Sequence, residues 1–387
     1  MADTVTVKVI EQCEVSPPPD TVPSTFFPLT FFDLPWLCCL PLKRIFFYHF
    51  PYSSQHFLQT SLPTLKHSLS LTLQHFFPFS SNLVFLPKPN PPHILFTQTD
   101  SNSISFSVAE STADFTTLVS DSTSHVAADG RAFHHFMKFW ASICKFKGDL
   151  ENVESKGEIR DVASDRVCHT FVLSHDHGEK LKKWVSIKCK SHGLAMPQHI
   201  TTFVVTCPLI WICKVKSEEA EVGNIVPNND ESYILAFMLD YCNCPECSIP
   251  FEYFGNYLVC GNAEVKRSKL VGENGVVEAA IAIGSEVRHL QRETFQGAET
   301  LMSNLTEFAH MTILAGSPKL QVYETDFGWG KPKRSEVVHV DNSGTISLSD
   351  CRDKEGRIEV GIALQKTQMN RFITILEEHL TKIAVLD

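Results

Sequence analysis

Segments typical of strands and of helices alternate along the C-terminal half of the sequence, and this order constrains the fold more than any other feature. We expect helices at residues 178–190, 202–216, 276–294 and 366–383. We expect strands at residues 170–173, 233–239, 319–323, 337–340 and 358–364. The order predicts a mixed α/β domain between Cys168 and Leu386.

The N-terminal half combines short strands with two helices. Strands are expected at residues 4–9, 82–85 and 94–97, and helices at residues 55–77 and 131–144. Pro78 is expected to end the first of these helices.

A polar, charged stretch at residues 147–165 follows and is expected to connect two domains. A chain of 387 residues is long enough for two domains of ordinary size. We therefore expect an N-terminal domain at residues 1–165 and a C-terminal domain at residues 166–387.

Composition and charge exclude several classes of protein. Hydrophobic residues make up 43% and charged residues 20% of the chain, which is the balance of a globular protein and not of a disordered one. The net charge of -10 repels a phosphate backbone, so nucleic acid is not an expected partner. Prolines interrupt the apolar stretch at residues 25–42, and neither a secretory signal nor a membrane span is expected. Thirteen cysteines without an evident framework indicate reduced thiols and a cytoplasmic location.

His125, Asp129 and Gly130 form a His-x-x-x-Asp-Gly motif directly before the expected aromatic helix. Acyl transfer from a thioester to a hydroxyl needs a base that takes the hydroxyl proton, and the pKa of histidine suits this role. A carboxylate four residues on can hold the loop or orient the imidazole ring. Among 17 histidines this spacing also arises by chance, so a histidine in a turn remains the alternative.

A second motif near the C-terminus reads Asp326, Phe327, Gly328, Trp329 and Gly330. Two glycines around a tryptophan indicate a tight loop with close approach of the backbone. A packed turn capped by the aspartate is the alternative, so this motif alone assigns no activity.

Together the two motifs resemble those of the plant BAHD acyltransferases, which carry HxxxD in mid-chain and DFGWG near the C-terminus. The resemblance covers nearly the whole chain in the right order. Residues 29–36 resemble the N-terminal strand of the family and residues 67–78 its first long helix. Residues 253–256, 265–270 and 344–359 are similar to the branch that acylates anthocyanin and phenolic glucosides.

This resemblance implies two α/β domains of the chloramphenicol-acetyltransferase type, with an active-site channel between them. It implies that His125 is the general base for attack of a glucoside hydroxyl on the thioester of an acyl-CoA. The implied donor is malonyl-CoA, with a hydroxycinnamoyl-CoA as the alternative, and the implied acceptor is a phenolic or flavonoid glucoside. Neither a metal nor a permanently bound cofactor is implied, and the protein is expected to be a monomer.

Further roles follow from the resemblance near the two motifs. Asp129 and Gly130 are implied to be structural. Asp326 is either a second catalytic carboxylate or an anchor for the loop of Phe327–Gly330, and the glycines around Trp329 favour the anchor. Arg131 is a candidate for holding the malonyl carboxylate, with a solvent-facing helix arginine as the alternative.

Three residues of the C-terminal half are candidates for binding CoA. Thr201 and Thr202 precede an apolar helix, whose N-terminus attracts phosphate, and Lys188 lies nearby. Simple N-capping by threonine and a solvated lysine are the alternative.

The sequence departs from the family pattern in two respects. Family members have core strands between the equivalents of Asp121 and His125, and a second shortening lies between Gly148 and Asp165. Losing inner strands is expected to expose sheet edges and apolar surface.

The family pattern Asp-x-Arg-x-Arg is replaced here by Asp240, Cys242 and Cys244. This removes the arginine implied to pair with Asp129, which destabilises a buried carboxylate. A non-catalytic homologue is therefore the alternative from a different class. Four cysteines could be read as a metal site: Cys242, Cys244, Cys247 and Cys260. Zinc usually needs four ligands presented by two compact turns, so inert thiols are the expected alternative.

Overall fold

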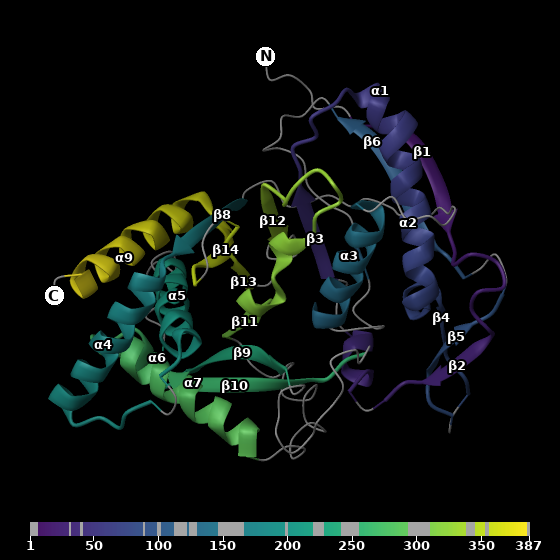
Figure 1. Ribbon diagram of the computed structural model, residues 1–387. Helices are drawn as coiled ribbons and strands as arrows, with labels where there is room; N and C mark the ends of the chain where they lie inside the picture. Colours follow the sequence, from purple (N-terminus) through teal and green to yellow (C-terminus); the bar gives the residue numbers. More distant parts are fainter. Residues whose placement is uncertain are drawn as a thin grey trace. The chain divides into compact units, whose positions relative to one another are not determined.

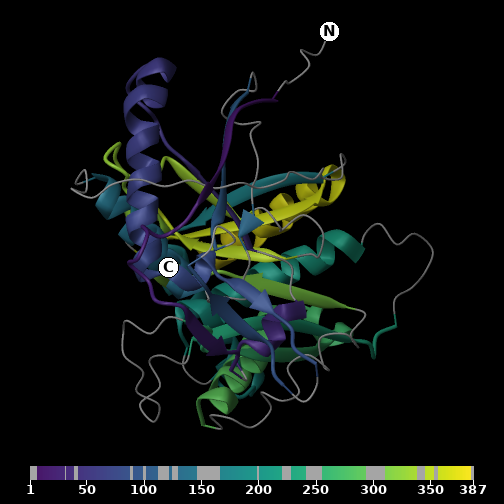
Figure 2. The same ribbon diagram turned by 90° about the vertical axis from the view of Figure 1, so that its right-hand side faces the viewer.

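The computed structural model describes residues 7–30, 32–38, 42–87, 90–98, 102–111, 122–123, 130–145, 166–197, 200–219, 228–240, 255–292, 310–337, 345–352 and 356–384 (Figure 1, Figure 2). The chain divides into two compact units, each assembled from three stretches. Unit 1 comprises Met1–Asp161, Glu252–Asn256 and Leu320–Val338, and unit 2 comprises Val162–Phe251, Tyr257–Lys319 and His339–Asp387. The boundary predicted after residue 165 stays a prediction; the units separate after Asp161, and two short stretches of the C-terminal half belong to unit 1.

A six-stranded sheet, ordered β10-β9-β11-β13-β14-β8, forms the centre of unit 2. Its strands are β8 (Arg166–Leu173), β9 (Ser232–Asp240), β10 (Leu258–Lys266), β11 (Met311–Ala315), β13 (Ile346–Asp350) and β14 (Ile358–Gln365). β9, β11 and β13 run parallel, and β10, β14 and β8 pair antiparallel with their neighbours. β9 is buried from Tyr233 to Phe237, as expected of a continuous apolar run in the interior of a sheet.

The helices of unit 2 gather on one side of this sheet (Figure 1). They are α4 (His175–His192), α5 (Thr202–Glu219), the short α6 (Arg267–Leu270), α7 (Gly275–Arg292) and α9 (Lys366–Ala384). α5 contacts α4, α7 and α9, and every side chain from Val204 to Val215 is buried. A helix that is apolar on all sides needs such an enclosed place, and α5 therefore lies at the centre of the core.

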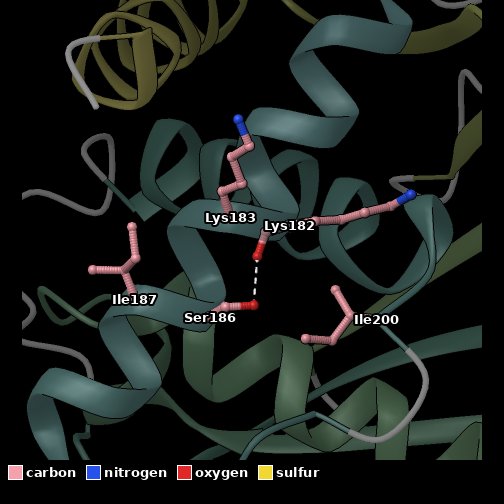
Figure 3. Close-up of a pocket in the computed structure, with 5 residues that line it drawn as sticks. All are labelled: Lys182, Lys183, Ser186, Ile187 and Ile200. Carbon is pink, nitrogen blue, oxygen red and sulfur yellow. Dashed lines mark hydrogen bonds between the residues drawn. The ribbon is translucent and has the colours of Figure 1, made fainter. Parts of the chain in front are cut away.

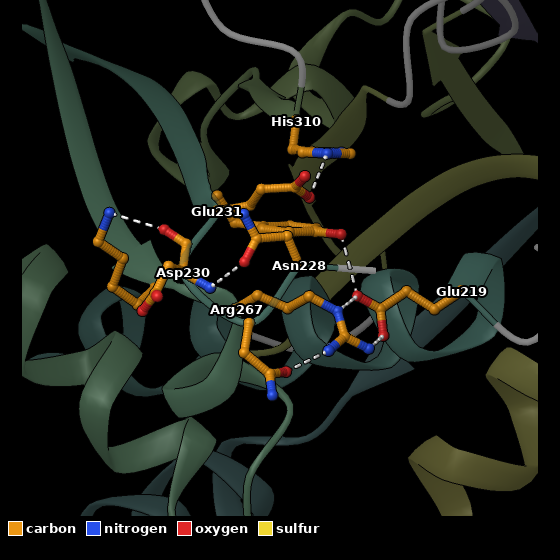
Figure 4. A network of polar contacts seen from close by, with 9 residues as sticks. Glu219, Asn228, Asp230, Glu231, Arg267 and His310 are labelled. Carbon is orange, nitrogen blue, oxygen red and sulfur yellow. Dashed lines mark hydrogen bonds and ion pairs between the residues drawn. The ribbon is translucent and has the colours of Figure 1, made fainter. Parts of the chain in front are cut away.

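A polar network joins the end of α5 to the start of α6 (Figure 4). Arg267 donates two hydrogen bonds of 2.7 Å to the carboxylate of Glu219 and one of 2.8 Å to Asn229. The Tyr233 hydroxyl donates to Glu219 at 2.9 Å, and the Tyr233 ring stacks on His310 with ring centroids 4.5 Å apart. A bidentate guanidinium–carboxylate pair fixes orientation as well as distance, so the network holds this end of the sheet in one geometry.

The described strands of unit 1 form three small sheets, ordered β1-β6, β2-β5-β4 and β12-β3-β7. The strands are β1 (Val7–Val15), β2 (Thr25–Pro28), β3 (Leu42–Phe47), β4 (Asn82–Val84), β5 (His93–Phe96), β6 (Ile104–Ser111), β7 (Ser122–Thr123) and β12 (Arg334–Val337). The helices are α1 (Ser54–His56), which continues through a π-helical turn (Phe57–Ser61) into α2 (Leu62–His75), and α3 (Gly130–Lys145). α2 and α3 pack on each other and bury a second, smaller core that includes Leu69, Leu73, Phe136 and Met137.

Two stretches from the C-terminal half complete unit 1. β12 adds to β3 with antiparallel pairing. Asn256, which is fully buried, donates from Nδ2 to Oδ1 of Asp33 at 3.0 Å, and Oδ2 of Asp33 accepts from the Thr30 amide at 2.8 Å. Residues from the stretches 29–36 and 253–256, which both carry the family resemblance, therefore meet in space.

The helices predicted from periodicity are confirmed as α1–α2, α3, α4, α5, α7 and α9. The strand predicted at residues 319–323 is wrong, because this stretch forms two 3-10 turns separated by Gln321, whose φ of 52° is incompatible with a strand. The strand expected at residues 29–36 is wrong as well. The Asp33 side chain accepts hydrogen bonds from Thr30 and thereby forms a turn, and a 3-10 helix begins at Leu34.

No helix within the described ranges is long and apolar enough to cross a membrane.

Candidate active site

The structure describes the helix that follows the HxxxD motif, whereas His125 and Asp129 themselves lie outside the described residues. α3 begins at Gly130, directly after the motif, and its buried side includes Ala132, His134, Phe136, Met137 and Ala141. Phe136, Met137 and Ala141 belong to the core that α3 shares with α2. α3 is therefore packed into the core of unit 1.

Gly130 and Arg131, which the sequence singles out, lie in the first turn of α3. A Cβ atom at Gly130 would lie 3.6 Å from Cδ1 of Leu320, so the start of the helix is close to the segment that leads into the second motif. Arg131 is half-buried.

The second motif forms a loop organised by the carboxylate of Asp326. Its Oδ1 atom accepts hydrogen bonds of 2.9 Å from the amides of both Gly328 and Gly330. Its Oδ2 atom lies 2.5 Å from Nζ of Lys145, the last residue of α3. Gly328 and Gly330 have φ angles of 97° and 87°, which only glycine adopts readily, and this explains both glycines of the motif.

Aromatic side chains also hold this loop. Phe327 is buried and packs edge-to-face on Trp140 of α3, with ring centroids 4.9 Å apart. Trp329 packs against Tyr48, Phe50 and Phe57, with centroids 5.3–6.1 Å apart. The loop therefore contacts α3 and the chain that follows β3 at the same time.

Charge and burial shift the pKa values of two groups at this loop. Burial acts to raise the pKa of Asp326, but the hydrogen bonds from Lys145 and from the amides of Gly328 and Gly330 outweigh it, and the pKa lies below its usual value. Burial, and then the negative charge of Asp326, raise the pKa of Tyr48, whose hydroxyl donates to the Thr325 carbonyl at 2.7 Å. Both groups are thus held in one protonation state at neutral pH, which suits a structural role.

A buried histidine lies in α3 one turn after the start of the helix. His134 is 2% exposed and packs edge-to-face on Phe46, and none of the described residues forms a hydrogen bond with its Nδ1 atom. Burial, and then the positive charges of Arg44 and Lys138, hold its pKa well below the usual value. The ring is therefore neutral in the folded protein.

The three residues proposed for CoA lie in unit 2. Thr201 accepts a hydrogen bond of 3.2 Å from the Val204 amide, so it caps α5, and Thr202 is the first residue of that helix. Lys188, on α4, lies 3.6 Å from a carboxylate oxygen of Glu273. Thr201 therefore has the contact that the structural alternative requires, whereas Lys188 is half-buried beside Glu273 rather than fully solvated.

A shallow groove of about 450 Å³ lies beside these residues (Figure 3). Lys182, Lys183, Ser186 and Ile187 of α4 line it together with Ile200, which precedes Thr201. The Ser186 hydroxyl donates to the Lys182 carbonyl at 2.8 Å, and Lys182 Nζ is bonded to Glu179 at 2.7 Å. Lys188, Thr201 and Thr202 are not among its lining residues.

Among the residues that the structure describes, no group of three or more His, Cys, Asp or Glu side chains is placed to hold a metal ion. Of the four cysteines considered as a metal site, Cys260 is buried in β10, and the other three, Cys242, Cys244 and Cys247, lie outside the described residues.

Sequence reasoning missed Lys145 and the pairing of Asp33 with Asn256. Asp33 and Asn256 both stand in stretches that the family resemblance singles out, but their contact joins positions 223 residues apart. Lys145 belongs to no motif, and its position in the last turn of the helix after HxxxD was the one available signal.

The fold of the chain has a match among solved structures. A crystal structure of vinorine synthase matches it with a TM-score of 0.64 over 95% of this chain and 96% of that chain, at 15% sequence identity. At that identity the match concerns the fold alone.

Two sequence comparisons then define the family. Residues 147–379, more than half of the chain, match the model of the Transferase family. Coumaroyl-CoA:anthocyanidin 3-O-glucoside-6''-O-coumaroyltransferase 1 from Arabidopsis thaliana is 32% identical, with 97% of this chain and 98% of the relative covered. Malonyl-coenzyme A:anthocyanin 3-O-glucoside-6''-O-malonyltransferase from Dahlia pinnata is 31% identical over 96% of this chain and 97% of the relative. The chain belongs to the BAHD acyltransferase family.

Two further details of these matches concern how much of the relatives this chain retains. The alignment with the Arabidopsis relative is 466 residues long, whereas the chain has 387, so the relative has residues inside the matched range that this chain lacks. The range matched by the family model begins after His125.

Proposed function

We propose that this protein transfers an acyl group from a CoA thioester to a sugar hydroxyl of a phenolic or flavonoid glucoside. The observation that carries the proposal is the match over nearly the full chain with relatives named as anthocyanin glucoside acyltransferases. The coenzyme is a co-substrate and leaves after each turnover. No permanently bound cofactor and no metal takes part in the proposed reaction.

His125 is the proposed general base. It takes the proton of the acceptor hydroxyl as that oxygen attacks the thioester carbonyl, and collapse of the tetrahedral intermediate releases CoA. Such base catalysis contributes about 10²–10⁴ to the rate. Positioning of both substrates and hydrogen-bond donors to the developing oxyanion supply the remainder.

Asp326 is proposed to be the anchor of its loop rather than a second catalytic carboxylate. Both of its oxygens accept hydrogen bonds, from Gly328, Gly330 and Lys145, and these bonds are sufficient to explain the carboxylate as a structural group. Asp129 and Gly130 are proposed to shape the loop that carries His125.

Malonyl-CoA is the proposed donor, and a hydroxycinnamoyl-CoA is the alternative. Relatives of both kinds match this chain at nearly equal identity, 31% for the malonyltransferase and 32% for the coumaroyltransferase. A malonyl carboxylate needs a cation in the acyl pocket, and Arg131 is proposed for this role. Lys188, Thr201 and Thr202 are proposed to bind the phosphates of CoA.

A non-catalytic homologue is the second candidate. The longer relative and the cysteines at positions 242 and 244 favour it, because residues inside the matched range are missing and the expected arginine partner of Asp129 is replaced. Either form of the protein is proposed to be a cytoplasmic monomer whose partners are small molecules, with neither nucleic acid nor membrane among them.

Competition between donors tests the proposed function. Purified full-length protein is incubated with equal concentrations of malonyl-CoA and coumaroyl-CoA and with a panel of flavonoid glucosides, and products are identified by mass spectrometry. We expect malonylated glucoside to predominate, and Arg131→Ala to reduce malonyl transfer more than coumaroyl transfer. If coumaroylated glucoside predominated, the donor would be a hydroxycinnamoyl-CoA and not malonyl-CoA. The absence of any product from folded protein would favour the non-catalytic homologue.

A further inference from the structure

Lys145 stands at the far end of the helix that follows the proposed base. It is the last residue of α3, and its ammonium group lies 2.5 Å from Oδ2 of Asp326. The Asp326 side chain is 21% exposed and that of Lys145 44%, so water screens the pair only in part. A cation in the last turn also interacts favourably with the helix dipole.

The carboxylate of Asp326 connects two structures. One oxygen binds the amides of Gly328 and Gly330 and so belongs to the loop, and the other binds Lys145 and so belongs to α3. The backbone is equally close, because a Cβ atom at Gly328 would lie 3.5 Å from the Cα atom of Lys145. The loop and the end of the helix therefore move together.

The segment that ends in this loop contacts α3 along its length. Leu320 lies beside Gly130 at the start of the helix, and Gln321 accepts a hydrogen bond of 3.2 Å from Lys138 in the middle. Asp326 then binds Lys145 at the end. A helix of 16 residues is about 24 Å long, so these contacts reach from one end to the other.

α2 packs against the C-terminal half of α3, where Phe136, Met137, Ala141 and Cys144 are buried. Trp140 donates from Nε1 to the Leu65 carbonyl of α2 at 3.0 Å, and Phe136 and Met137 are buried against that helix. Apolar packing of this kind still allows a small tilt of the helix, and a tilt also displaces the turn that follows His125. The ion pair at Lys145 restrains this tilt.

From this geometry we propose that Lys145 is a positioning residue for acyl transfer, which acts by tying the end of α3 to Asp326 and so fixing the direction of the helix that follows His125. The proposal rests on the proposed function in taking His125 as the base. A misplacement of about 1 Å at a reacting group can cost about 10²-fold in rate, so a small tilt is sufficient to matter.

The first test measures amide hydrogen exchange in the full chain and needs no activity. Lys145→Met removes the charge and keeps the length of the side chain, and Lys145→Arg keeps the charge. Lys331→Met is the matched control, since Lys331 pairs with Glu324 at 2.6 Å in the same segment but with no contact to α3 among the described interactions. We expect severalfold faster exchange in Lys145→Met at residues 134–137, a full turn or more inside α3, and exchange as in the unmodified protein for the other two variants.

The second test is steady-state kinetics of the same variants. We expect kcat of Lys145→Met to fall about tenfold or more with the KM values of both substrates unchanged, and Lys145→Arg to recover most of kcat. A lysine that only stabilises the fold would lower the melting temperature and leave kcat per folded molecule unchanged.

The outcomes separate this proposal from the proposed function. Faster exchange limited to the last turn of α3, or equal exchange in Lys145→Met and Lys331→Met, overturns the positioning role. Unchanged kcat in an active Lys145→Met variant overturns it as well. Absence of turnover in the unmodified protein overturns the proposed function, and the exchange measurement then decides on its own whether the ion pair fixes α3.

Discussion

In unit 2, one six-stranded sheet and a helix that is buried on all sides share a single core, whereas the described strands of unit 1 form three sheets of two or three strands. The difference is visible at the surface. Of the thirteen large hydrophobic side chains that are exposed among the described residues, nine lie in unit 1, including Phe26, Phe27 and Phe85. Small sheets have a high proportion of edge and cover few of their own apolar side chains.

Unit 1 compensates with contacts to segments that are distant in sequence. β12 extends the sheet of β3, Asn256 binds Asp33, and the Asp326 loop binds α3. Unit 1 therefore depends more on contacts between distant segments, whereas the larger apolar core lies in unit 2. Substitutions in the two units should therefore fail in different ways.

Removing core volume from unit 2 is expected to have the largest effect on stability. Trp211 in α5 is completely buried, and Trp211→Ala is expected to lower the free energy of unfolding by about 3–5 kcal/mol because the enclosed helix leaves a cavity. Urea denaturation followed by circular dichroism measures this change. A loss of less than about 1 kcal/mol would contradict the enclosed position of α5.

Breaking the Asn256–Asp33 contact is expected to destabilise unit 1 although Asn256 stands in the C-terminal half of the chain. Asn256→Ala removes the amide that donates to a buried carboxylate oxygen, which costs about 1–3 kcal/mol. Limited proteolysis should then cut unit 1 before unit 2. As a control, Asn229→Ala removes an acceptor of Arg267 at an exposed site in unit 2 and should leave the cleavage pattern unchanged. If Asn256→Ala instead led to earlier cleavage of unit 2, the assignment of Asn256 to unit 1 would be contradicted.

Acid is expected to weaken unit 1 more than unit 2. His134 is buried and its folded pKa lies well below the unfolded value of about 6.5, so the unfolded chain takes up the proton first. The stability that depends on neutral His134 is therefore complete above pH of about 6.5 and is lost as the pH falls below it. His134→Leu should flatten the pH dependence of unit 1 between about pH 6.5 and pH 5.

His379 of unit 2 provides the comparison for this experiment. Burial, and then the charges of Lys216 and Lys382, lower its pKa as well, while Glu378 acts in the opposite direction. Its side chain is only half-buried, so His379→Leu should change the pH dependence less than His134→Leu does. Equal effects of the two substitutions, measured by thermal unfolding at several pH values, would remove this distinction between the units.

The smallest effect on folding is expected at the exposed apolar side chains of unit 1. Phe85 is 66% exposed, so Phe85→Ser should change the free energy of unfolding by less than about 0.5 kcal/mol. It should nevertheless reduce self-association at high concentration, as measured by light scattering, because it removes uncovered apolar surface. Ile187→Ser, at a 50% exposed position on α4, is the matched substitution in unit 2 and should reduce self-association less. Equal reductions would indicate that the exposed surface of unit 1 has no special role.

The sequence predicts the helices of this protein better than its strands. Periodicity identifies α4, α5, α7 and α9 because each is long enough to show several turns. It does not identify β3, β6, β10, β11 and β13, because a strand is stabilised by partner strands from distant parts of the chain, which local periodicity does not show. For the same reason the sequence predicts the loop of Asp326 but not its partner Lys145, which is 181 residues away. His125 and Asp129 stay predictions, because they lie outside the described residues.

The most direct test of the central claim is turnover of the unmodified protein beside His125→Ala, with an acyl-CoA and a flavonoid glucoside. We predict that the unmodified protein releases CoA and forms the acylated glucoside. His125→Ala should be slower by about 10²-fold or more while circular dichroism and melting temperature remain as before. Equal turnover by the two proteins would show that His125 is not the base, and the absence of turnover from folded, unmodified protein would contradict the proposed activity and favour the non-catalytic homologue.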